Sequence, residues 1–274
     1  MKCAVASGCY PLLMVIATLG AAAPARGQTP ADPPPISDIQ TTRSDDASPP
    51  TRAALMPTWG SLFGSTLGDL RRLPSKDSFA WLGVGALGAI AGHPADSTVT
   101  RTLSGAQALH EPLEPGAIIG GTAFQLGAAF TTYALGRATN SPRAATVGAD
   151  LFRAELLTEA TTQALKFTVR RTRPDGSSYS FPSGHTAVSF ASATVLQHHF
   201  GWKVGIPAYG LAAYVAASRV QMKRHYLSDV AFSAALGVAA GRTITIGRGA
   251  GRFAVAPTAA PAGGAINFVW VGQR

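Results

Sequence analysis

The sequence predicts an all-α helical bundle, and three observations support this fold class. Glycine supplies 30 of the 274 residues and 46% of the chain is hydrophobic, a composition that suits one core of closely packed helices. The alternation of apolar and polar residues that marks a half-buried strand is hard to find. Runs without charged side chains succeed one another along the chain, over residues 79–92, 116–136, 186–197, 204–218 and 230–241.

The N-terminus has the layout of a secretory signal. A lysine at position 2 precedes an apolar stretch over residues 10–23, and small residues follow as far as Gly27. This layout predicts a signal peptide over residues 1–27 and export to the cell envelope. Cys3 and Cys9, the two cysteines of the sequence, both lie in this segment. The mature chain is therefore expected to have no disulfide, no cysteine nucleophile and no thiolate metal site.

Composition divides the remainder of the chain into three parts. Residues 28–75 open with a stretch rich in proline, aspartate, serine and threonine, and they are predicted to form a disordered linker. Residues 76–247 contain the apolar runs and form the predicted helical domain. Residues 248–274 contain two short extended segments around a Pro/Gly turn, which makes them an extended C-terminal tail and a candidate β-hairpin.

Charge and hydropathy leave two environments open for the bundle. The net charge is +9, which fits either a solvated basic surface or contact with anionic lipid headgroups. The basic residues are not interleaved with aromatic ones along a stripe, so nucleic acid is not expected as a partner. Of the apolar runs, only residues 116–136 reach the ~20 residues that a membrane-spanning helix needs. The helices are therefore either embedded in a membrane or packed in a soluble bundle.

The first cluster of chemically interesting residues is "KFTVRRTRP", Lys166 to Pro174. If this segment is helical, Lys166, Arg170 and Arg173 share one face. Like charges at such spacing repel one another, and an anion bound between them would offset the repulsion. The cluster is thus either a solvated basic face or an anion-binding site.

The second cluster, "SFPSGHTAVSF", predicts the start of a helix near Gly184. Ser183 is a suitable N-cap, and the free N–H groups at a helix start form an anion site together with the helix dipole. Glycine at position 184 lets the backbone approach a ligand closely, and His185 stands beside it. Taken alone, this stretch is explained equally well by a capped helix with a core histidine.

The third cluster is "SRVQMKRHYLSD", Ser218 to Asp229. Arg219 supplies a forked cation that suits phosphate oxygens. His225 and Asp229 are four residues apart, so on a helix the carboxylate would accept a hydrogen bond from one ring nitrogen of His225. The other ring nitrogen would then be free to act as a nucleophile or a base.

Together, the three clusters resemble the three-part signature of the type 2 phosphatidic acid phosphatase (PAP2) and vanadium haloperoxidase superfamily. The match extends over roughly residues 160–230 and includes both residue types and spacing. The apolar runs on either side fit the helical bundle of that family. The matching positions are Lys166, Arg173 and Pro174; Pro182, Ser183, Gly184 and His185; and Ser218, Arg219, His225 and Asp229.

The resemblance implies a role for each polar member of the signature. His225 would attack phosphorus and form a phosphohistidine, and Asp229 would orient it. His185 would protonate the departing alkoxide and then help to activate water. The phosphoryl oxygens would be bound by Lys166, Arg173 and Arg219 and by the backbone N–H groups of Ser183 and Gly184. The four other basic residues near these motifs would at most add to the local field; they are Arg170, Arg171, Lys223 and Arg224.

The leading functional prediction is a metal-independent phosphatase that hydrolyses phosphate monoesters or lipid (di)phosphates. It is expected to be embedded in the inner membrane or associated with it, with the active site facing the periplasm. No acidic cluster suited to a metal stands beside the motifs, so neither a metal nor another cofactor is expected. The substrate is either a phospholipid or a phosphorylated small molecule. One alternative is a vanadate-dependent haloperoxidase, because vanadate mimics phosphate, although such enzymes are usually longer. The other is a non-catalytic envelope protein, against which the intact set of catalytic residues argues.

Overall fold

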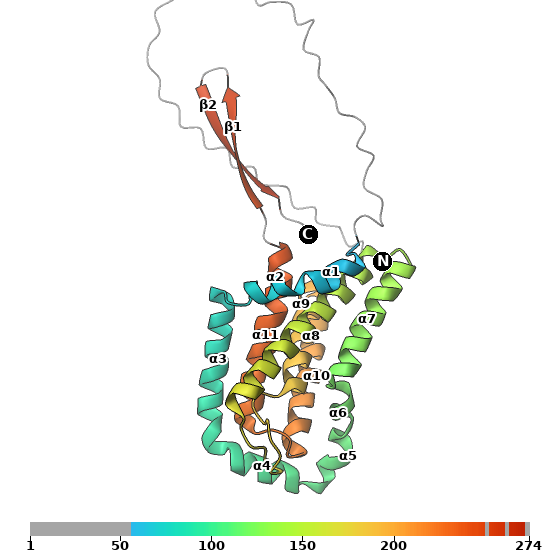
Figure 1. Cartoon of the computed structure of the whole chain (residues 1–274), viewed down its shortest axis with the longest axis vertical. Helices are drawn as coiled ribbons and strands as arrows, with labels where there is room; N and C mark the ends of the chain where they lie inside the picture. Colours follow the sequence, from blue (N-terminus) through green and yellow to red (C-terminus); the bar gives the residue numbers. More distant parts are fainter. Residues whose placement is uncertain (1–55, 250–251, 261–262, 272–274) are drawn as a thin grey trace, which may run out of the picture. The chain divides into compact units, whose positions relative to one another are not determined.

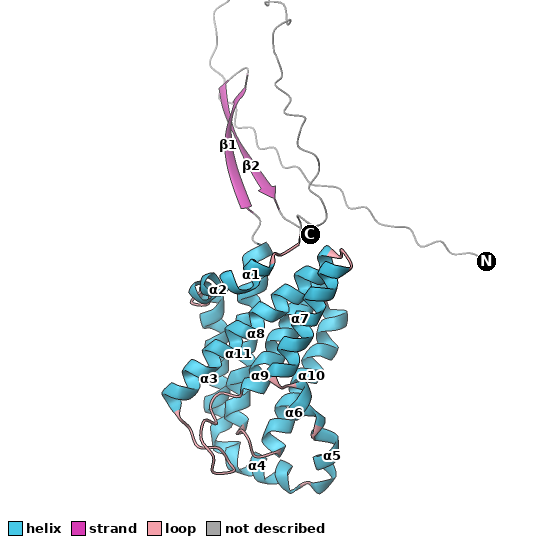
Figure 2. Ribbon diagram, turned by 45° about the vertical axis from the view of Figure 1, so that its right-hand side comes forward, coloured by secondary structure: helices cyan, strands magenta, loops and turns pink. Residues whose placement is uncertain are grey.

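The computed structural model describes residues 56–249, 252–260 and 263–271, and the surroundings of side chains as far as residue 246. The predicted signal peptide and the first part of the predicted linker lie outside these residues. Helices dominate the described part of the chain, which confirms the predicted all-α bundle (Figure 2). The α-helices are α1 (Trp59–Gly64), α2 (Thr66–Arg72), α3 (Lys76–Gly92), α4 (Asp96–Gly105), α5 (His110–Leu113), α6 (Pro115–Ile119), α7 (Thr122–Ala138), α8 (Pro142–Val169), α9 (Gly184–Phe200), α10 (Trp202–Gln221) and α11 (Leu227–Gly249).

The long helices α3 and α7 to α11 lie side by side and form the bundle (Figure 1). Helix α8 contacts α7, α9 and α11, while α3 packs on α11 and α10 packs on α9. The short helices α4, α5 and α6 contact α10, and α4 and α5 lie at the lower end of the bundle in Figure 1. The chain segments that join α8 to α9 and α10 to α11 therefore lie close to α4.

Glycine allows the helix backbones to approach one another very closely at two crossings. A Cβ atom on Gly148 of α8 would lie 2.2 Å from the backbone nitrogen of Tyr133 in α7. A Cβ atom on Gly237 of α11 would lie 2.2 Å from the carbonyl oxygen of Ala187 in α9. Real side chains do not tolerate such distances, so these positions require glycine. The glycine-rich composition is thus explained, at least here, by close helix packing.

The linker predicted over residues 28–75 is wrong in its last part, because α1 and α2 fold there. Leu62 of α1 is fully buried in the core. Asp69 of α2 is 1% exposed and accepts two hydrogen bonds from Arg153 of α8, at 2.8 Å from Nε and 2.5 Å from Nη2. A buried apolar side chain and a buried ion pair therefore fix a segment whose composition indicated a linker.

The apolar run over residues 116–136, which by length alone could span a membrane, is not one helix. Helix α6 ends at Ile119, α7 begins at Thr122, and two glycines lie between them. A Cβ atom on Gly120 would lie 2.3 Å from Cγ1 of Val215 in α10, so the interruption lets the backbone pack against α10. Within the described residues, one helix is long and apolar enough to cross a membrane, α11 over Leu227–Ile246, and 67% of that segment is buried in the bundle.

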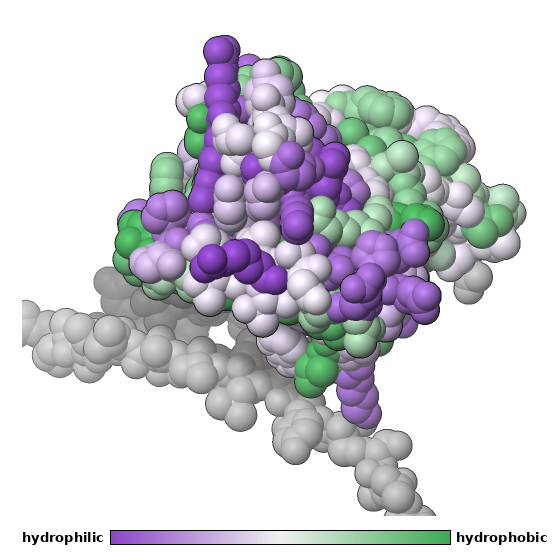
Figure 3. All heavy atoms as spheres, turned by 90° about the horizontal axis from the view of Figure 1, so that it is seen from below, coloured by the Kyte–Doolittle hydropathy of each residue, from purple (hydrophilic) through white to green (hydrophobic). Residues whose placement is uncertain are grey.

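The outer surface of the bundle carries many exposed large apolar side chains. Their exposed fractions reach 70% at Ile90 of α3, 58% at Leu135 of α7 and 68% at Ile206 of α10. The lower end of the bundle has a different character, because hydrophilic residues cover much of it (Figure 3). The molecule therefore combines apolar sides with a polar end.

The C-terminal residues include a two-stranded antiparallel sheet of β1 (Arg252–Ala260) and β2 (Gly263–Val271). Arg252 lies opposite Val271 at the open end of this hairpin, and Ala260 lies opposite Gly263 at the closed end. These strands occupy the region where the sequence predicts two extended segments.

Candidate active site

The predicted site residues come together at the polar end of the bundle. Lys166 lies in the last turn of α8, His185 in the first turn of α9, Arg219 in the last turn of α10 and Asp229 in the first turn of α11. Arg173 and His225 lie on the segments that connect these helices. The charges of Lys166, Arg173 and Arg219 all act on both histidines, which shows that the members form one cluster.

His225 has the tautomer and the charge state of a nucleophile. Its Nδ1 lies 2.5 Å from the backbone carbonyl oxygen of Ser180, and because a carbonyl can only accept, Nδ1 carries the hydrogen. The lone pair is therefore on Nε2. The ring is 3% exposed, and burial together with the charge of Lys166 holds the pKa of His225 well below its usual value. His225 is thus a neutral imidazole with an available Nε2.

Asp229 does not accept the hydrogen bond from His225 that the sequence predicts. The two side chains are 3.9 Å apart between Nδ1 and Oδ2, beyond hydrogen-bond distance, because α11 begins at Leu227 and His225 lies outside the helix. Instead, Asp229 Oδ2 accepts from the hydroxyl of Ser180 at 2.5 Å and from the N–H of Tyr226 at 2.9 Å. Ser180, which the sequence analysis missed, therefore links the carboxylate of Asp229 to the ring of His225.

A second polar layer behind Asp229 was also missed. Arg171 donates to Asp229 Oδ1 at 2.5 Å and to Asp96 of α4 at 2.7 Å. Asp96 also accepts from the backbone and the hydroxyl of Ser228, at 2.8 and 2.6 Å. Burial acts to lower the pKa of Arg171, but the hydrogen bond to Asp96 and the charge of Asp229 outweigh burial, so the pKa of Arg171 is raised. Arg171 therefore does more than add to the field, because it fixes Asp229 to α4.

The three predicted phosphate-binding cations are poorly paired in the protein. Lys166 Nζ donates to the carbonyl of Tyr179 at 2.8 Å, and burial with the charge of Arg173 lowers the pKa of Lys166 to about 8. The Nε atoms of Arg173 and Arg219 are buried and have no hydrogen-bond partner. Buried donors without acceptors are costly, so an anion bound among them would satisfy them.

Arg173 reaches this cluster by a different route from the predicted one. Helix α8 ends at Val169, so Lys166, Arg170 and Arg173 do not share a helical face. The N–H of Arg173 donates to the carbonyl of Ser177 at 2.7 Å, and the carbonyl of Arg173 accepts from Gly176 at 3.0 Å. A tight turn therefore carries Arg173 to the site.

The start of α9 has the predicted cap and part of the predicted anion site. Ser183 is the N-cap, and its hydroxyl accepts from the N–H of Thr186 at 3.4 Å. The N–H of Ser183, expected to bind phosphate, donates instead to the hydroxyl of Ser233 at 2.7 Å. Gly184 and His185 occupy the first two helical positions, where N–H groups have no acceptor within the helix. The available helix-end donors are therefore those of residues 184 and 185.

His185 lies beside the cations and is uncharged at neutral pH. Burial and the charge of Arg219 lower the pKa of His185 to about 4. A hydrogen bond with the backbone of Ala117 in α6 acts in the opposite direction but is outweighed. A bound dianion would neutralise the surrounding cations and raise this pKa again. Protonation of His185 is therefore expected to be coupled to the arrival of an anion.

The chemical capacity of the site follows from this donor set. Three cations and a helix N-terminus can bind the oxygens of a tetrahedral oxyanion, and a neutral imidazole lies among them. Among the residues that the structure describes, no group of three or more His, Cys, Asp or Glu side chains is placed to hold a metal ion.

Comparison with known families shows similarity to one of them over the part of the chain that holds this site. Residues 148–250 match the sequence model of the PAP2 superfamily, a segment that contains all the predicted site residues. The match confirms, over this segment, the resemblance predicted from the three clusters.

Individual proteins show more limited similarity. Over 80 aligned residues, the chain is 39% identical to a lipid A 1-phosphatase of Porphyromonas gingivalis. The aligned segment is 28% of this chain and 18% of the length of that relative. The crystal structure of LpxE from Aquifex aeolicus superposes on this chain with a TM-score of 0.46 and 20% sequence identity. The superposition covers 54% of this chain and 93% of the LpxE chain. The transmembrane PAP2-type phosphatidylglycerolphosphate phosphatase of Bacillus subtilis has 22% identity and a TM-score of 0.48, covering 67% and 92%.

Proposed function

We propose that the protein is a metal-independent phosphatase that acts on lipid phosphates through a phosphohistidine intermediate. The observation that carries this proposal is the state of His225. Its Nδ1 hydrogen is held by the Ser180 carbonyl at 2.5 Å, so the lone pair of Nε2 is available beside three cations. A neutral nucleophile next to an anion-binding site is the arrangement that attack on a phosphate requires.

In the first half-reaction, the Nε2 lone pair of His225 forms a bond to phosphorus while the bond between phosphorus and the ester oxygen breaks. The phosphoryl oxygens are held by Lys166, Arg173 and Arg219, which stabilise the charge of the transition state. His185, protonated when the dianion binds, gives its proton to the leaving alkoxide, so the product is a neutral alcohol.

In the second half-reaction, neutral His185 takes a proton from water and the hydroxide attacks the phosphohistidine. The bond between Nε2 and phosphorus breaks, inorganic phosphate leaves and His225 recovers its lone pair. Asp229 acts through Ser180 and keeps the imidazole oriented throughout. The cations take the part that a divalent metal takes in many phosphoryl-transfer enzymes.

A lipid substrate is supported by the surface of the bundle. Large apolar side chains are exposed on the outer faces of α3, α7 and α10, including Leu87 at 69% and Phe124 at 54%. Exposed apolar surface of this extent suits contact with the hydrocarbon part of a membrane. We therefore place the sides of the bundle in a bilayer and the polar end, with the active site, in water. The signal-like N-terminus supports export, with the site facing the periplasm.

The test is phosphate release by the purified protein and by His225→Ala, with EDTA present. Micellar phosphatidic acid and p-nitrophenyl phosphate are offered in parallel. Release from both that vanishes in the variant supports the proposal, and a higher rate with the lipid supports the substrate class. Quenching in alkaline detergent during turnover of ³²P-labelled substrate should trap a base-stable phosphoprotein in the wild type alone, and its label should be lost on later treatment with acid. Loss of activity in EDTA would contradict metal independence, and peroxide-dependent halogenation with vanadate would favour the haloperoxidase.

A further inference from the structure

A carboxylate that the proposed reaction does not use lies at the edge of the active site. Glu159 is on α8, about two turns before Lys166 and therefore on the same side of the helix. A Cβ atom on Gly184, the first residue of α9, would lie 3.6 Å from Glu159 Oε2. Burial and the charge of Arg173 lower the pKa of Lys166, and the charge of Glu159 acts in the opposite direction. Glu159 is thus close to two of the predicted phosphate-binding groups.

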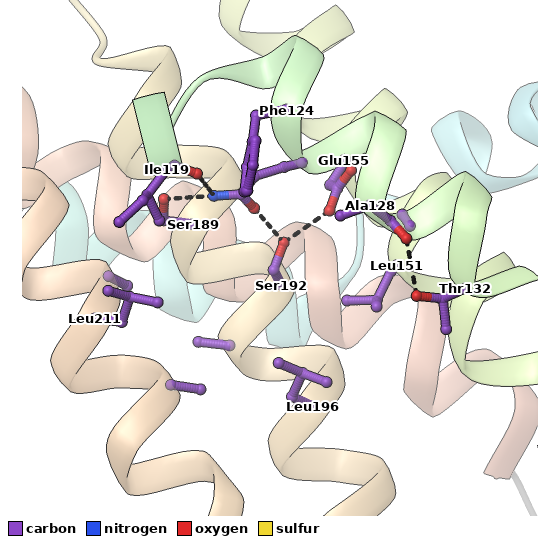
Figure 4. A pocket seen from close by; sticks show the side chains of 15 residues that line it. Ile119, Phe124, Ala128, Thr132, Leu151, Glu155, Ser189, Ser192, Leu196 and Leu211 are labelled. Atoms are coloured by element: carbon purple, nitrogen blue, oxygen red, sulfur yellow. Dashed lines mark hydrogen bonds between the residues drawn. The ribbon is translucent and has the colours of Figure 1, made fainter. Parts of the chain in front are cut away.

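Glu159 is the carboxylate of α8 that a bound molecule can reach. Asp150 and Glu155, the other carboxylates of this helix, are 1% and 2% exposed. Glu155 lies in the wall of the cavity between α7, α8, α9 and α10, where its Oε1 is 2.9 Å from the hydroxyl of Ser192 (Figure 4). Glu159 is only half-buried. It can therefore contact a ligand, whereas the other two carboxylates are enclosed by protein.

The carboxylate of Glu159 is held in place but keeps unused acceptor capacity. Its Oε1 accepts from Nε2 of Gln163 at 2.5 Å, and its Oε2 accepts from the hydroxyl of Thr122 at 3.1 Å. A carboxylate offers about four lone-pair sites, so roughly half of them remain open to a donor on a ligand.

Glu159 and His185 contact the same short segment of the chain. The backbone of Ala117 in α6 forms a hydrogen bond with His185, and the hydroxyl of Thr122 at the start of α7 donates to Glu159. Gly184, which adjoins Glu159 Oε2, is also the residue before His185. In the proposed reaction His185 protonates the leaving oxygen, so the alcohol part of the substrate begins at His185. Glu159 is therefore on the side of the site that the leaving group occupies.

A carboxylate in this position is unfavourable for the binding of phosphate alone. Its negative charge repels a phosphate dianion and partly offsets the charge of Lys166. The same carboxylate becomes favourable when the ligand brings a hydrogen-bond donor of its own, because hydrogen bonds to charged groups are stronger than those between neutral groups. The position of Glu159 therefore favours phosphate esters whose alcohol part carries a donor.

We propose that Glu159 is a specificity-determining residue that accepts a hydrogen bond from a hydroxyl or ammonium group on the alcohol part of the substrate, close to the ester oxygen. The inference rests on the proposed phosphatase function and narrows its substrate class to lipid phosphates with a polar group beside the phosphate. The phosphate ester of a plain alkyl or prenyl chain has no such donor and leaves the charge of Glu159 uncompensated.

The test compares three lipid phosphates that differ in one group: 1-oleoyl glycerol 3-phosphate, its analogue without the 2-hydroxyl, and its analogue with an ammonium group in that place. Steady-state kcat/KM is measured in mixed micelles with the full-length protein. An electronegative substituent also improves the leaving group, so the ratios between substrates are compared in the wild type and in Glu159→Leu. Preference for the hydroxyl and the ammonium substrates should be at least about tenfold stronger in the wild type, as loss of a hydrogen bond to a charged group predicts.

Two further variants make the assignment specific. Glu159→Gln keeps an acceptor but loses the charge, so the preference for the hydroxyl should be retained within about threefold while that for the ammonium falls about tenfold. Ala160→Leu, at the exposed alanine next to Glu159, is the control and should leave both ratios unchanged. If Glu159 acts only through Lys166, Glu159→Leu will slow all three substrates equally, and the proposal is overturned.

A binding measurement separates this inference from the proposed function. Isothermal titration calorimetry with His225→Ala, which cannot form the phosphohistidine, gives Kd for the same three lipids, and the analogue without the 2-hydroxyl should bind about tenfold more weakly than the other two. That preference without any hydrolysis by the wild type would support the role of Glu159 and contradict the proposed function. Hydrolysis of all three lipids at ratios that Glu159→Leu does not change would support the proposed function and overturn the role of Glu159.

Discussion

The link through Ser180 gives a prediction that can be worked out from the structure. The Ser180 hydroxyl donates to Asp229 Oδ2 at 2.5 Å, and its carbonyl accepts from His225 Nδ1 at 2.5 Å. Ser180→Ala removes the first contact and leaves the second, because the carbonyl belongs to the backbone. A hydrogen bond to a charged group is worth about 1.5–3 kcal/mol. If all of it is lost in the transition state, kcat falls about 10- to 150-fold.

The assay is steady-state hydrolysis of p-nitrophenyl phosphate, in which loss of orientation should appear in kcat with little change in KM. Ser177→Ala is the matched control, since Ser177 lies on the same connection, contacts Asp175 at 2.6 Å through its hydroxyl and is exposed. It should retain the wild-type kcat within about twofold, as surface substitutions usually do. If Ser180→Ala keeps the wild-type kcat while Asp229→Asn loses activity, the carboxylate acts on His225 by another route and the reasoning is refuted.

Three further predictions concern His185 as the proposed general acid, Lys166 as an anion-binding cation, and the close packing of α8 against α7 at Gly148. His185→Ala should slow hydrolysis of alkyl phosphates about 10²- to 10⁴-fold and that of p-nitrophenyl phosphate far less, because the latter leaving group needs no proton; equal losses would contradict the assignment. Sulfate inhibition should weaken above pH about 8, where Lys166 loses its proton, and should persist to higher pH in Lys166→Arg. Gly148→Ala should lower the free energy of unfolding, measured by urea denaturation, by about 3 kcal/mol, because the new Cβ would collide with the backbone of Tyr133. Gly127→Ala is the control and should leave the free energy of unfolding unchanged, because a Cβ there has no atom within 4 Å.

The parts of the site that depend on neighbouring residues could be predicted from the sequence. The N-cap at Ser183 and the helix start at Gly184 are confirmed, since capping is decided within one turn of chain. The prediction that Arg173 lies on the same helix as Lys166 was wrong, because α8 ends at Val169. Pro174 already indicates in the sequence that a helix does not continue through Arg173. A residue before proline is biased away from the helical region, so the helix had to end before it.

Contacts between distant parts of the chain could not be predicted in this way. The carbonyl of Ser180 and the ring of His225 are 45 residues apart, and Asp96 and Ser228 are 132 residues apart. No periodicity or local motif relates them, because their meeting depends on how α4, α9 and α11 pack. The buried pair of Asp69 and Arg153 illustrates the same limit, since a polar segment was assigned to a linker whereas its aspartate is buried against α8.

The uncompensated cations of the active site have a consequence for the stability of the whole protein. Lys166, Arg173 and Arg219 repel one another, and the buried Nε donors of both arginines lack acceptors, so folding without a ligand assembles an unfavourable cluster. The capacity to bind an oxyanion and maximal stability are therefore in conflict at this end of the bundle. An oxyanion resolves the conflict by mass action, so the melting temperature should rise with sulfate concentration. By the same reasoning, Arg219→Leu should give a protein that is inactive but melts at a higher temperature, with a smaller rise in melting temperature on addition of sulfate.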